Sequence, residues 1–345
     1  MGTLRIKGVI ELNQFWPLGS SDADTTKIKL KVSANSFEYR KDGQAAFKKT
    51  AVFADAISKG QGSKPVINTR KSDGVQTITI RLQGVDAPEL HYSAAPLKKS
   101  TGVSDAKRKL YNDTNKDRRQ CFAESATVAL AKNLKGYASN GVANAVFESE
   151  VDHPFEVVDT YGRFIGNIKV GTSHDINVWL VENGWCTPSF YTSMSRREIE
   201  IFLKAWEKGK KINGRTSKAV SYDASKFDWK LLYRKPSTVT NFKIGDDKGN
   251  AIMPKLFRRQ TAWMVSKKAT VEAANTSFKA HLQNTPDQLV LLKDFLQQGL
   301  SSSQVHSLHD FITAKAAILK KPEELVFQEK PGTLVNAKGK KIINW

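Results

Sequence analysis

Apolar residues at every second position are the feature that most constrains the fold of this chain. They occur in three separate segments before residue 83, and Lys, Thr and Arg fill many of the positions between them. A spacing of two places alternate side chains on one face of a β-strand. The sequence therefore predicts half-buried strands at about residues 6–12, 28–32 and 78–82.

The spacing of apolar residues becomes typical of a helix after residue 120 and is again typical of strands after residue 141. Phe122, Ala126 and Leu130 are spaced as on a helix, and Ser195 with Glu198 forms a capping box that opens another. The expected order is a helix at 122–134, strands at 142–151, 155–158 and 164–170, a short helix from 176 to 183, and a helix after 195. Five or so strands and three helices in this order predict an α+β fold, a small closed barrel of the OB type with packed helices.

The length of 345 residues favours roughly two domains. We expect a barrel domain over residues 1–217, with insertions at about 41–76 and 91–119, and a basic, mostly helical accessory region over 218–345. The first insertion is expected to be an extended loop with one short helix. Helical spacing in the accessory region covers about residues 271–278, 289–296 (opened by Thr285-Pro286) and 305–319.

The charge of the chain is strongly positive, with 54 Lys and Arg against 34 Asp and Glu, a net +20. Cations that neutralise phosphates release counterions, so this excess favours a nucleic-acid partner, although a purely solubilising role is the alternative. No apolar run approaches the ~18 residues of a membrane span, and no secretory h-region follows the N-terminus. We therefore expect no membrane partner, and a protein that is either cytoplasmic or exported without a recognisable signal peptide. Cys121 and Cys186 are expected to be buried thiols.

Charged residues lie at predicted strand ends in three segments, DADTTKIKL from Asp22, RLQGVDAPE from Arg81, and DTYGR ending at Arg163. The first two segments supply carboxylates, and the last two supply guanidinium groups. Carboxylate oxygens suit Ca²⁺ or Mg²⁺, and planar guanidinium forks suit a phosphodiester. Together these groups are typical of a phosphoryl-transfer site.

At these motifs the sequence resembles the staphylococcal nuclease (thermonuclease) family. Asp-Gly-Asp-Thr in that family is matched by residues 22–25, Arg-Leu-x-x-x-Asp-Thr-Pro-Glu by residues 81–89, and Tyr-Gly-Arg by residues 161–163. The likeness covers most of residues 5–215 and not the C-terminal region. Two positions differ, since Ala23 replaces Gly and Ala87 replaces Thr. The first change would matter only if residue 23 had a positive φ.

The resemblance implies a role for each matched residue. Asp24, Asp86 and the backbone carbonyl of Ala87 would hold one Ca²⁺ per site, with Asp22 and Thr25 in the layer behind them. Glu89 would orient or deprotonate the attacking water, and Arg81 and Arg163 would bind the phosphate and stabilise the transition state. The reaction implied is hydrolysis of DNA or RNA to products that carry a 3′-phosphate.

Further residues are candidates for binding nucleic acid. Tyr161, Phe190 and Tyr191 are expected to stack on bases, with core packing as the alternative for Phe190. Lys107, Arg108 and Lys109 belong to a basic stretch, residues 98–119, that either guides substrate or is a solvated loop.

The favoured function is thus a metal-dependent nuclease, a hydrolase of the thermonuclease type. The alternative is a non-catalytic adaptor that binds nucleic acid with the same barrel. In either case the C-terminal region is a candidate for clamping nucleic acid or for docking a protein partner.

Overall fold

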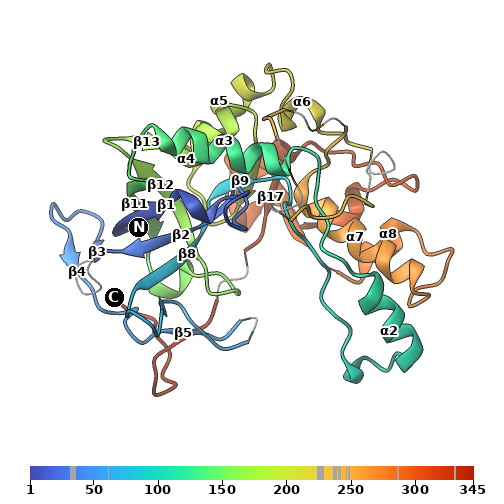
Figure 1. Cartoon of the computed structure of the whole chain (residues 1–345), viewed down its shortest axis with the longest axis horizontal. Coiled ribbons are helices and arrows are strands. Elements are labelled where there is room, and N and C mark those ends of the chain that lie inside the picture. The colour runs from blue at the N-terminus through green and yellow to red at the C-terminus, as the bar shows by residue number, and fades with distance from the viewer. Residues whose placement is uncertain are drawn as a thin grey trace. The chain divides into compact units, whose positions relative to one another are not determined.

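The structure is a computed structural model of the chain (Figure 1). It describes residues 1–31, 36–60, 62–223, 229–235, 239, 242–245, 247, 249–285, 287–329 and 332–345. The chain forms two compact units. The first comprises residues 1–83, 128–179 and 329–345, and the second comprises residues 84–127 and 180–328. Within the described ranges, no helix is long and apolar enough to cross a membrane.

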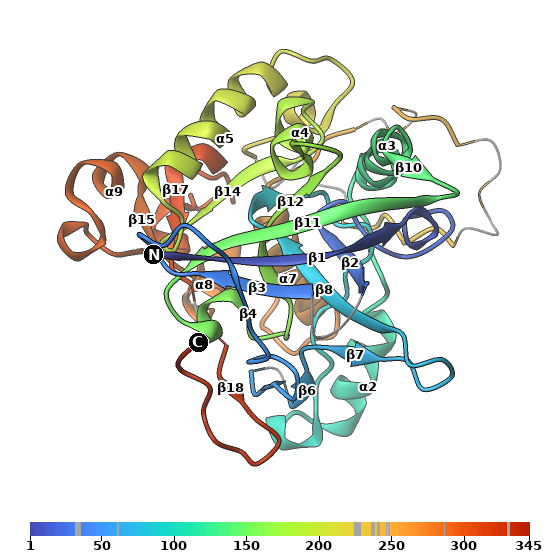
Figure 2. The same ribbon diagram turned by 90° about the vertical axis from the view of Figure 1, so that its left-hand side faces the viewer.

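The first unit contains a closed five-stranded β-barrel (Figure 2). Its strands are β1 (Gly2–Glu11), β2 (Thr25–Leu30), β8 (Gln76–Leu82), β12 (Phe164–Val170) and β11 (Val142–Val151), in that order around the barrel. Pairing of β11 with β1 closes the ring. Buried and exposed residues alternate along these strands because one face of each lines the core. The predicted OB-type α+β fold is confirmed.

The register of three barrel strands brings distant motifs together. β2 and β8 are antiparallel, with Thr25 opposite Arg81. β8 and β12 are parallel, with Ile165 opposite Arg81 on the other side. The backbone N–H of Leu82 also donates to the carbonyl of Asp24 at 2.8 Å. Residues that start β2, end β8 and precede β12 therefore lie at one end of the barrel.

The insertion at 41–76 differs from the expected loop with a short helix. After β3 (Phe37–Arg40), its described residues form only short strands, namely β4 (Lys48–Lys49), β5 (Ile57–Ser58), β6 (Lys64–Pro65) and β7 (Asn68–Thr69). The apolar patch at its centre serves the core instead, because Phe53 is buried with its ring 5.1 Å from that of Phe164.

The strand predicted at 155–158 is wrong, since Pro154 opens a single 3₁₀ turn, η3 (Pro154–Val157). The last residue expected in the second predicted strand, at position 32, lies outside the described residues.

The end of the chain also packs in the first unit (Figure 2). β18 (Leu334–Val335) pairs with β5, and the Trp345 ring stacks on Tyr39 with centroids 4.0 Å apart.

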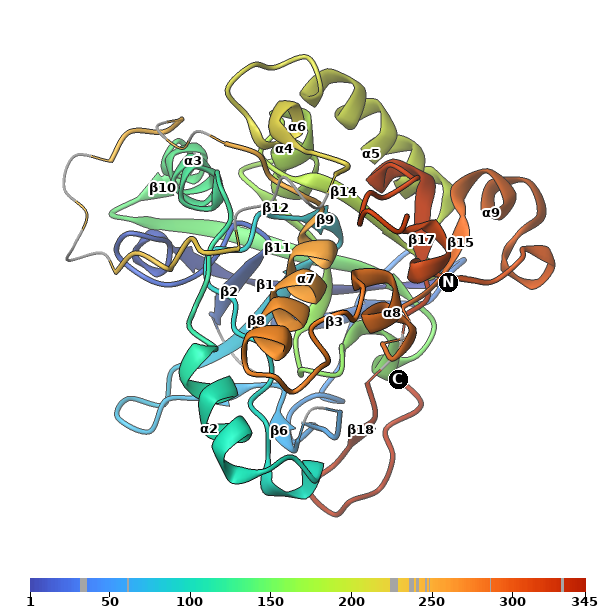
Figure 3. The ribbon, with the colours of Figure 1, turned by 90° about the vertical axis from the view of Figure 1, so that its right-hand side faces the viewer.

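The second unit combines helices with a five-stranded sheet (Figure 3). The sheet order is β16 (His306–Ser307), β15 (Gln288–Leu291), β17 (Leu325–Phe327), β14 (Thr187–Tyr191) and β9 (Gly84–Asp86). The helices of the second unit include α2 (Asp105–Thr114), α5 (Arg196–Gly209), α6 (Thr216–Ala219), α7 (Pro254–Lys268), α8 (Phe278–Gln283) and α9 (Leu292–Gln298). The helices predicted at 122–134 and 176–183 are present as α3 (Ala123–Lys135) and α4 (Ile176–Glu182).

Long-range strand pairing alters several local predictions in this unit. The segment expected as a helix at 289–296 begins as β15, because Leu289 and Val290 are fully buried opposite Phe327 and Val326. The helix expected at 305–319 is wrong. That segment forms β16 and one 3₁₀ turn, η7 (Leu308–Phe311), and then continues without a regular helix. Residues 98–119, considered as a loop, contain α2.

One core cluster of the second unit is built from residues after 250. Its fully or nearly buried apolar side chains are Ile252, Met253, Leu256, Phe257, Phe278, Leu282, Leu289, Leu308, Ile312, Ile318, Leu325 and Phe327. Cys121 and Cys186 are buried free thiols, as expected. The domain boundary near residue 217 stays a prediction about independent folding.

Candidate active site

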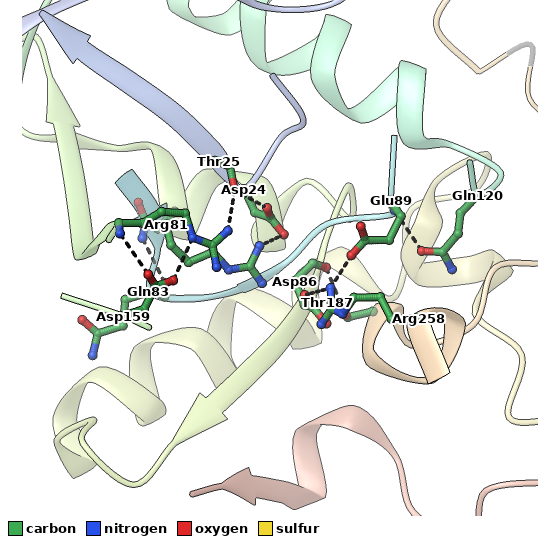
Figure 4. Close-up of polar contacts among 12 residues, drawn as sticks. Asp24, Thr25, Arg81, Gln83, Asp86, Glu89, Gln120, Asp159, Thr187 and Arg258 are labelled. Atoms are coloured by element: carbon green, nitrogen blue, oxygen red, sulfur yellow. Dashed lines mark hydrogen bonds and ion pairs between the residues drawn. The ribbon is translucent and has the colours of Figure 1, made fainter. Parts of the chain in front are cut away.

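A buried acid and an arginine meet at the barrel end of the first unit (Figure 4). Asp24, just before β2, is 3% exposed, and its Oδ2 pairs with Nη1 of Arg81 from β8. The Thr25 hydroxyl donates to Oδ1 of Asp24 at 3.2 Å. Burying a carboxylate costs free energy unless a cation and hydrogen bonds compensate, and strand register supplies both.

The second predicted arginine of this unit, Arg163, is held by Asp159. Oδ1 of Asp159 accepts the backbone N–H groups of Tyr161 and Arg163, each at 2.9 Å, and its Oδ2 accepts Nε of Arg163 at 2.7 Å. Gly162 completes the tight turn with a φ of +82°, which glycine adopts without strain. Nη1 of Arg163 reaches the Thr25 hydroxyl at 3.4 Å. Arg81, Arg163 and Thr25 are thus gathered at one end of the barrel.

In the second unit, Asp86 and Glu89 share an arginine that the sequence motifs did not indicate. Nη1 of Arg258, in α7, donates to Oε1 of Glu89 and lies 3.6 Å from Oδ1 of Asp86 (Figure 4). Asp86 is 2% exposed, and the Glu89 side chain is 11% exposed. The hydroxyl of Thr187, opposite Asp86 in β14, donates to the Asp86 carbonyl at 3.2 Å.

Gln120 holds the backbone at Glu89 in place. The N–H of Glu89 donates to Oε1 of Gln120 at 2.9 Å, and the N–H of Gln120 donates to the carbonyl of Glu89 at 2.8 Å. Nε2 of the same Gln120 donates to the carbonyl of Ile252 at 2.9 Å, two residues before α7. This buried amide therefore ties the Glu89 loop to the start of the helix that carries Arg258.

The two departures from the family motif cost little. Among the described residues, the non-glycine positions with positive φ are Phe122, Asn140, Thr270 and Ala316, so the Ala23 backbone is unstrained. Ala87 is buried next to Asp86, and its carbonyl survives the loss of a Thr hydroxyl. Asp22 is partly exposed, just before the buried pair Ala23 and Asp24.

The aromatic candidates lie in different surroundings. Tyr161 is 56% exposed, with the Arg163 guanidinium 5.2 Å from its ring centroid. Phe190 is fully buried in β14, where core packing accounts for it, and Tyr191 is partly exposed beside Phe327. Tyr161 therefore presents the more exposed ring, whereas Tyr191 also packs against a core cluster of the second unit.

The basic candidates lie on α2. Lys107 is exposed, Arg108 pairs with Asp105 at 2.6 Å, and Lys109 pairs with Asp113 at 2.6 Å. The Lys109 pair is solvent-exposed and therefore weak, so this lysine can exchange Asp113 for a phosphate, whereas the Arg108 side chain is only 16% exposed.

The donors present are of the type that a hard divalent cation prefers. Asp24 and Asp86 are buried carboxylates, and backbone carbonyls accompany them. Within the described part of the chain, no three His, Cys, Asp or Glu side chains gather as a ready metal cage. These donors fit Ca²⁺ in their chemistry. Each carboxylate is, however, paired with an arginine, so a cation would compete with Arg81 for Asp24 and with Arg258 for Asp86.

The barrel of the first unit is of the OB type and carries a buried acid–arginine pair, Asp24 with Arg81, at one of its ends. Residues 79–214 match the family model of staphylococcal nuclease homologues. The match begins inside β8, so Asp24 precedes it, and Arg258 lies beyond its end. A search of curated proteins gave no match for the chain.

Sequence reasoning missed three residues of these clusters. Asp159 lay within the quoted DTYGR segment, and its position two residues before Tyr161 was a usable signal for a turn that accepts backbone N–H groups. Gln120 and Arg258 carried no local signal, because their partners are 31 and 169 residues away in sequence.

Proposed function

We propose that the chain is a metal-dependent nuclease that hydrolyses phosphodiester bonds of DNA, RNA or both, with Ca²⁺ as its cation. The observation that carries the proposal is the turn at residues 159–163, which presents an oriented guanidinium at a barrel end. That turn lies inside the matched nuclease-homologue segment. Products ending in 3′-phosphate follow from the family resemblance.

In this proposal Arg81 and Arg163 bind the phosphate and stabilise the charge that develops on its oxygens. Two planar guanidinium groups can each donate paired hydrogen bonds to phosphate oxygens. Glu89 orients the attacking water and accepts its proton, and its carboxylate stands on a backbone fixed by Gln120. A cation held by Asp24, Asp86 and the Ala87 carbonyl would supply positive charge that polarises the phosphate.

Substrate binding uses charge and stacking. The net charge of +20 favours a polyanion, and α2 contributes three of its cations through Lys107, Arg108 and Lys109. Tyr161 and Tyr191 offer ring faces for stacking on bases, worth about 1–3 kcal/mol per base. The region after residue 217 is proposed as accessory, for clamping nucleic acid or docking a protein.

The test is end-group analysis of products from defined single- and double-stranded DNA and RNA at controlled Ca²⁺. Wild type should cleave only with a divalent cation and should leave 3′-phosphate ends. Arg81→Ala, Arg163→Ala and Glu89→Gln should each lower the cleavage rate by about 10²-fold or more while binding is largely kept. Arg196→Gln, a charge change on the exposed face of α5, is the matched control and should cleave normally.

Two outcomes would contradict the proposal. Full cleavage in excess chelator would rule out the metal dependence. Salt-dependent binding without cleavage by wild type in Ca²⁺, Mg²⁺ or Mn²⁺ would favour the adaptor.

A further inference from the structure

Arg258 belongs to a part of the chain that lies beyond the nuclease-homologue match, yet it contacts two of the acids that carry the proposed chemistry. It hydrogen-bonds Glu89 and lies 3.6 Å from Asp86 (Figure 4). The guanidinium therefore supplies the positive charge that these two poorly exposed carboxylates require.

The position of Arg258 is fixed by the helix on which it stands. Pro254 occupies the first turn of α7, and Leu256 and Phe257 are buried in the core of the second unit. The neighbouring Arg259 is committed elsewhere, since its Nε and Nη2 donate to Asp287 at 2.8 and 2.9 Å. Burial raises the pKa of Asp287, but the hydrogen bond from Arg259 and the positive charges of Lys255, Arg259 and Arg258 together more than offset this, so that pKa is lowered. The two adjacent arginines thus pair with different acids, Arg258 with Asp86 and Glu89, and Arg259 with Asp287.

The acidic partner is fixed as well. Gln120 bonds both backbone groups of Glu89 and the carbonyl of Ile252, so the loop and the start of α7 are joined at a second point. The contact between Arg258 and Glu89 is therefore built into the core of this unit. The Arg258 side chain is 26% exposed, which leaves it room to turn toward solvent.

We propose that Arg258 is a built-in counter-cation that competes with the divalent cation for Asp86 and so sets the metal affinity of the site. This inference rests on the proposed function, which makes Asp86 a metal ligand. Without the metal, Arg258 offsets part of the negative charge of Asp86 and Glu89. When the cation binds, Arg258 withdraws from Asp86, because two positive groups cannot share one carboxylate without repulsion.

The size of the effect follows from Coulomb's law. A divalent cation and a guanidinium about 5 Å apart repel each other, even at the dielectric constant of water, by enough to weaken binding about tenfold. Removing the charge at residue 258 should therefore strengthen cation binding by about tenfold or more. Keeping the charge while changing its shape should leave the affinity nearly unchanged.

The experiment is a calorimetric titration of the full chain with Ca²⁺ alone, without nucleic acid. Arg258→Gln should bind Ca²⁺ at least about tenfold more tightly than wild type. Arg258→Lys keeps the charge, and Arg196→Gln removes a charge from the exposed face of α5; both should stay within about threefold of wild type. Arg258→Gln should also melt at a lower temperature in chelator and gain more from saturating Ca²⁺ than wild type does.

Each alternative result has a definite meaning. Equal or weaker Ca²⁺ binding by Arg258→Gln overturns the inference, and the nuclease proposal survives if wild type still cleaves with Ca²⁺. Absence of binding to every variant overturns both the inference and the proposed metal site. Circular dichroism checks folding, and Arg258→Met, which keeps the length of the side chain, is judged by the same criterion if Arg258→Gln does not fold.

Discussion

Asp159 is expected to act on catalysis through Arg163, and substitution at Asp159 can separate that role from a structural one. Asn at this position keeps the Oδ1 acceptor for the two backbone N–H groups of the turn. Its amide nitrogen replaces Oδ2 and cannot accept Nε of Arg163. Asp159→Asn therefore keeps the turn and releases the arginine, whereas Asp159→Ala removes all three bonds.

The magnitudes follow from these bonds. An arginine that must be ordered again in each transition state costs up to about 2 kcal/mol of side-chain entropy, so Asp159→Asn should cleave about 10–30-fold more slowly. Its stability should fall by only about 1 kcal/mol or less, because the ion pair is partly exposed to solvent. Asp159→Ala should lose about 1–3 kcal/mol, since two further hydrogen bonds disappear.

The assay is single-turnover cleavage of a short oligonucleotide, with urea denaturation measured on the same samples. Arg163→Ala alone and combined with Asp159→Asn completes a double-mutant cycle. If Asp159 works through Arg163, Asp159→Asn should have almost no further effect on the rate once Arg163 is gone. An equal 10–30-fold fall in both backgrounds would refute this reasoning, as would an Asp159→Asn enzyme with the wild-type rate.

Three further predictions concern stability, binding and domain structure. Gly84→Ala should lower the free energy of unfolding by about 2–4 kcal/mol in urea denaturation, because φ is +75° and a Cβ would overlap the Phe202 ring; an unchanged midpoint would contradict this. Replacing Lys107, Arg108 and Lys109 by Ala should flatten the dependence of log K on log salt by about one to three units in binding titrations, and an unaltered slope would assign α2 to the solvated surface. A chain ending at Ser217 lacks β17 and β18, so it should be less stable than the full chain; cooperative unfolding with retained cleavage would support the boundary predicted there.

The barrel was predictable because its signal is local. Strands with one buried face show alternation in their own sequence, and β11 and β12 have the limits expected from it. The predictions for the insertion and for residues 305–319 were wrong for the opposite reason, because the signal there is not local. Val305 and Leu319 are exposed despite their helical spacing, and Phe53 is buried by a ring from another strand. Tertiary packing decided these segments.

The candidate site divides in the same way. Arg81 and Thr25 lie at matched motifs, and the strand register that pairs them follows from the predicted barrel. The role of Asp159 could have been predicted from the sequence, because its partners are two and four residues away. The role of Arg258 could not have been predicted, since nothing in MPKLFRR distinguishes an arginine that pairs with buried acids from one on a helix surface.

Closure of the barrel through β1 and β11 has a consequence for synthesis of the chain. Gly2 pairs with Val151 and Glu11 with Val142, so the first strand leaves the ribosome more than a hundred residues ahead of its partner. At about 5–20 residues per second, a gap of roughly 140 residues means a delay of roughly 7–30 s. During that interval an apolar strand has one unpaired edge, which is the geometry that promotes association between nascent chains. Contacts so distant in sequence also slow the final closure. Recovery of native protein should therefore depend on translation rate and on chaperones that cover a waiting strand.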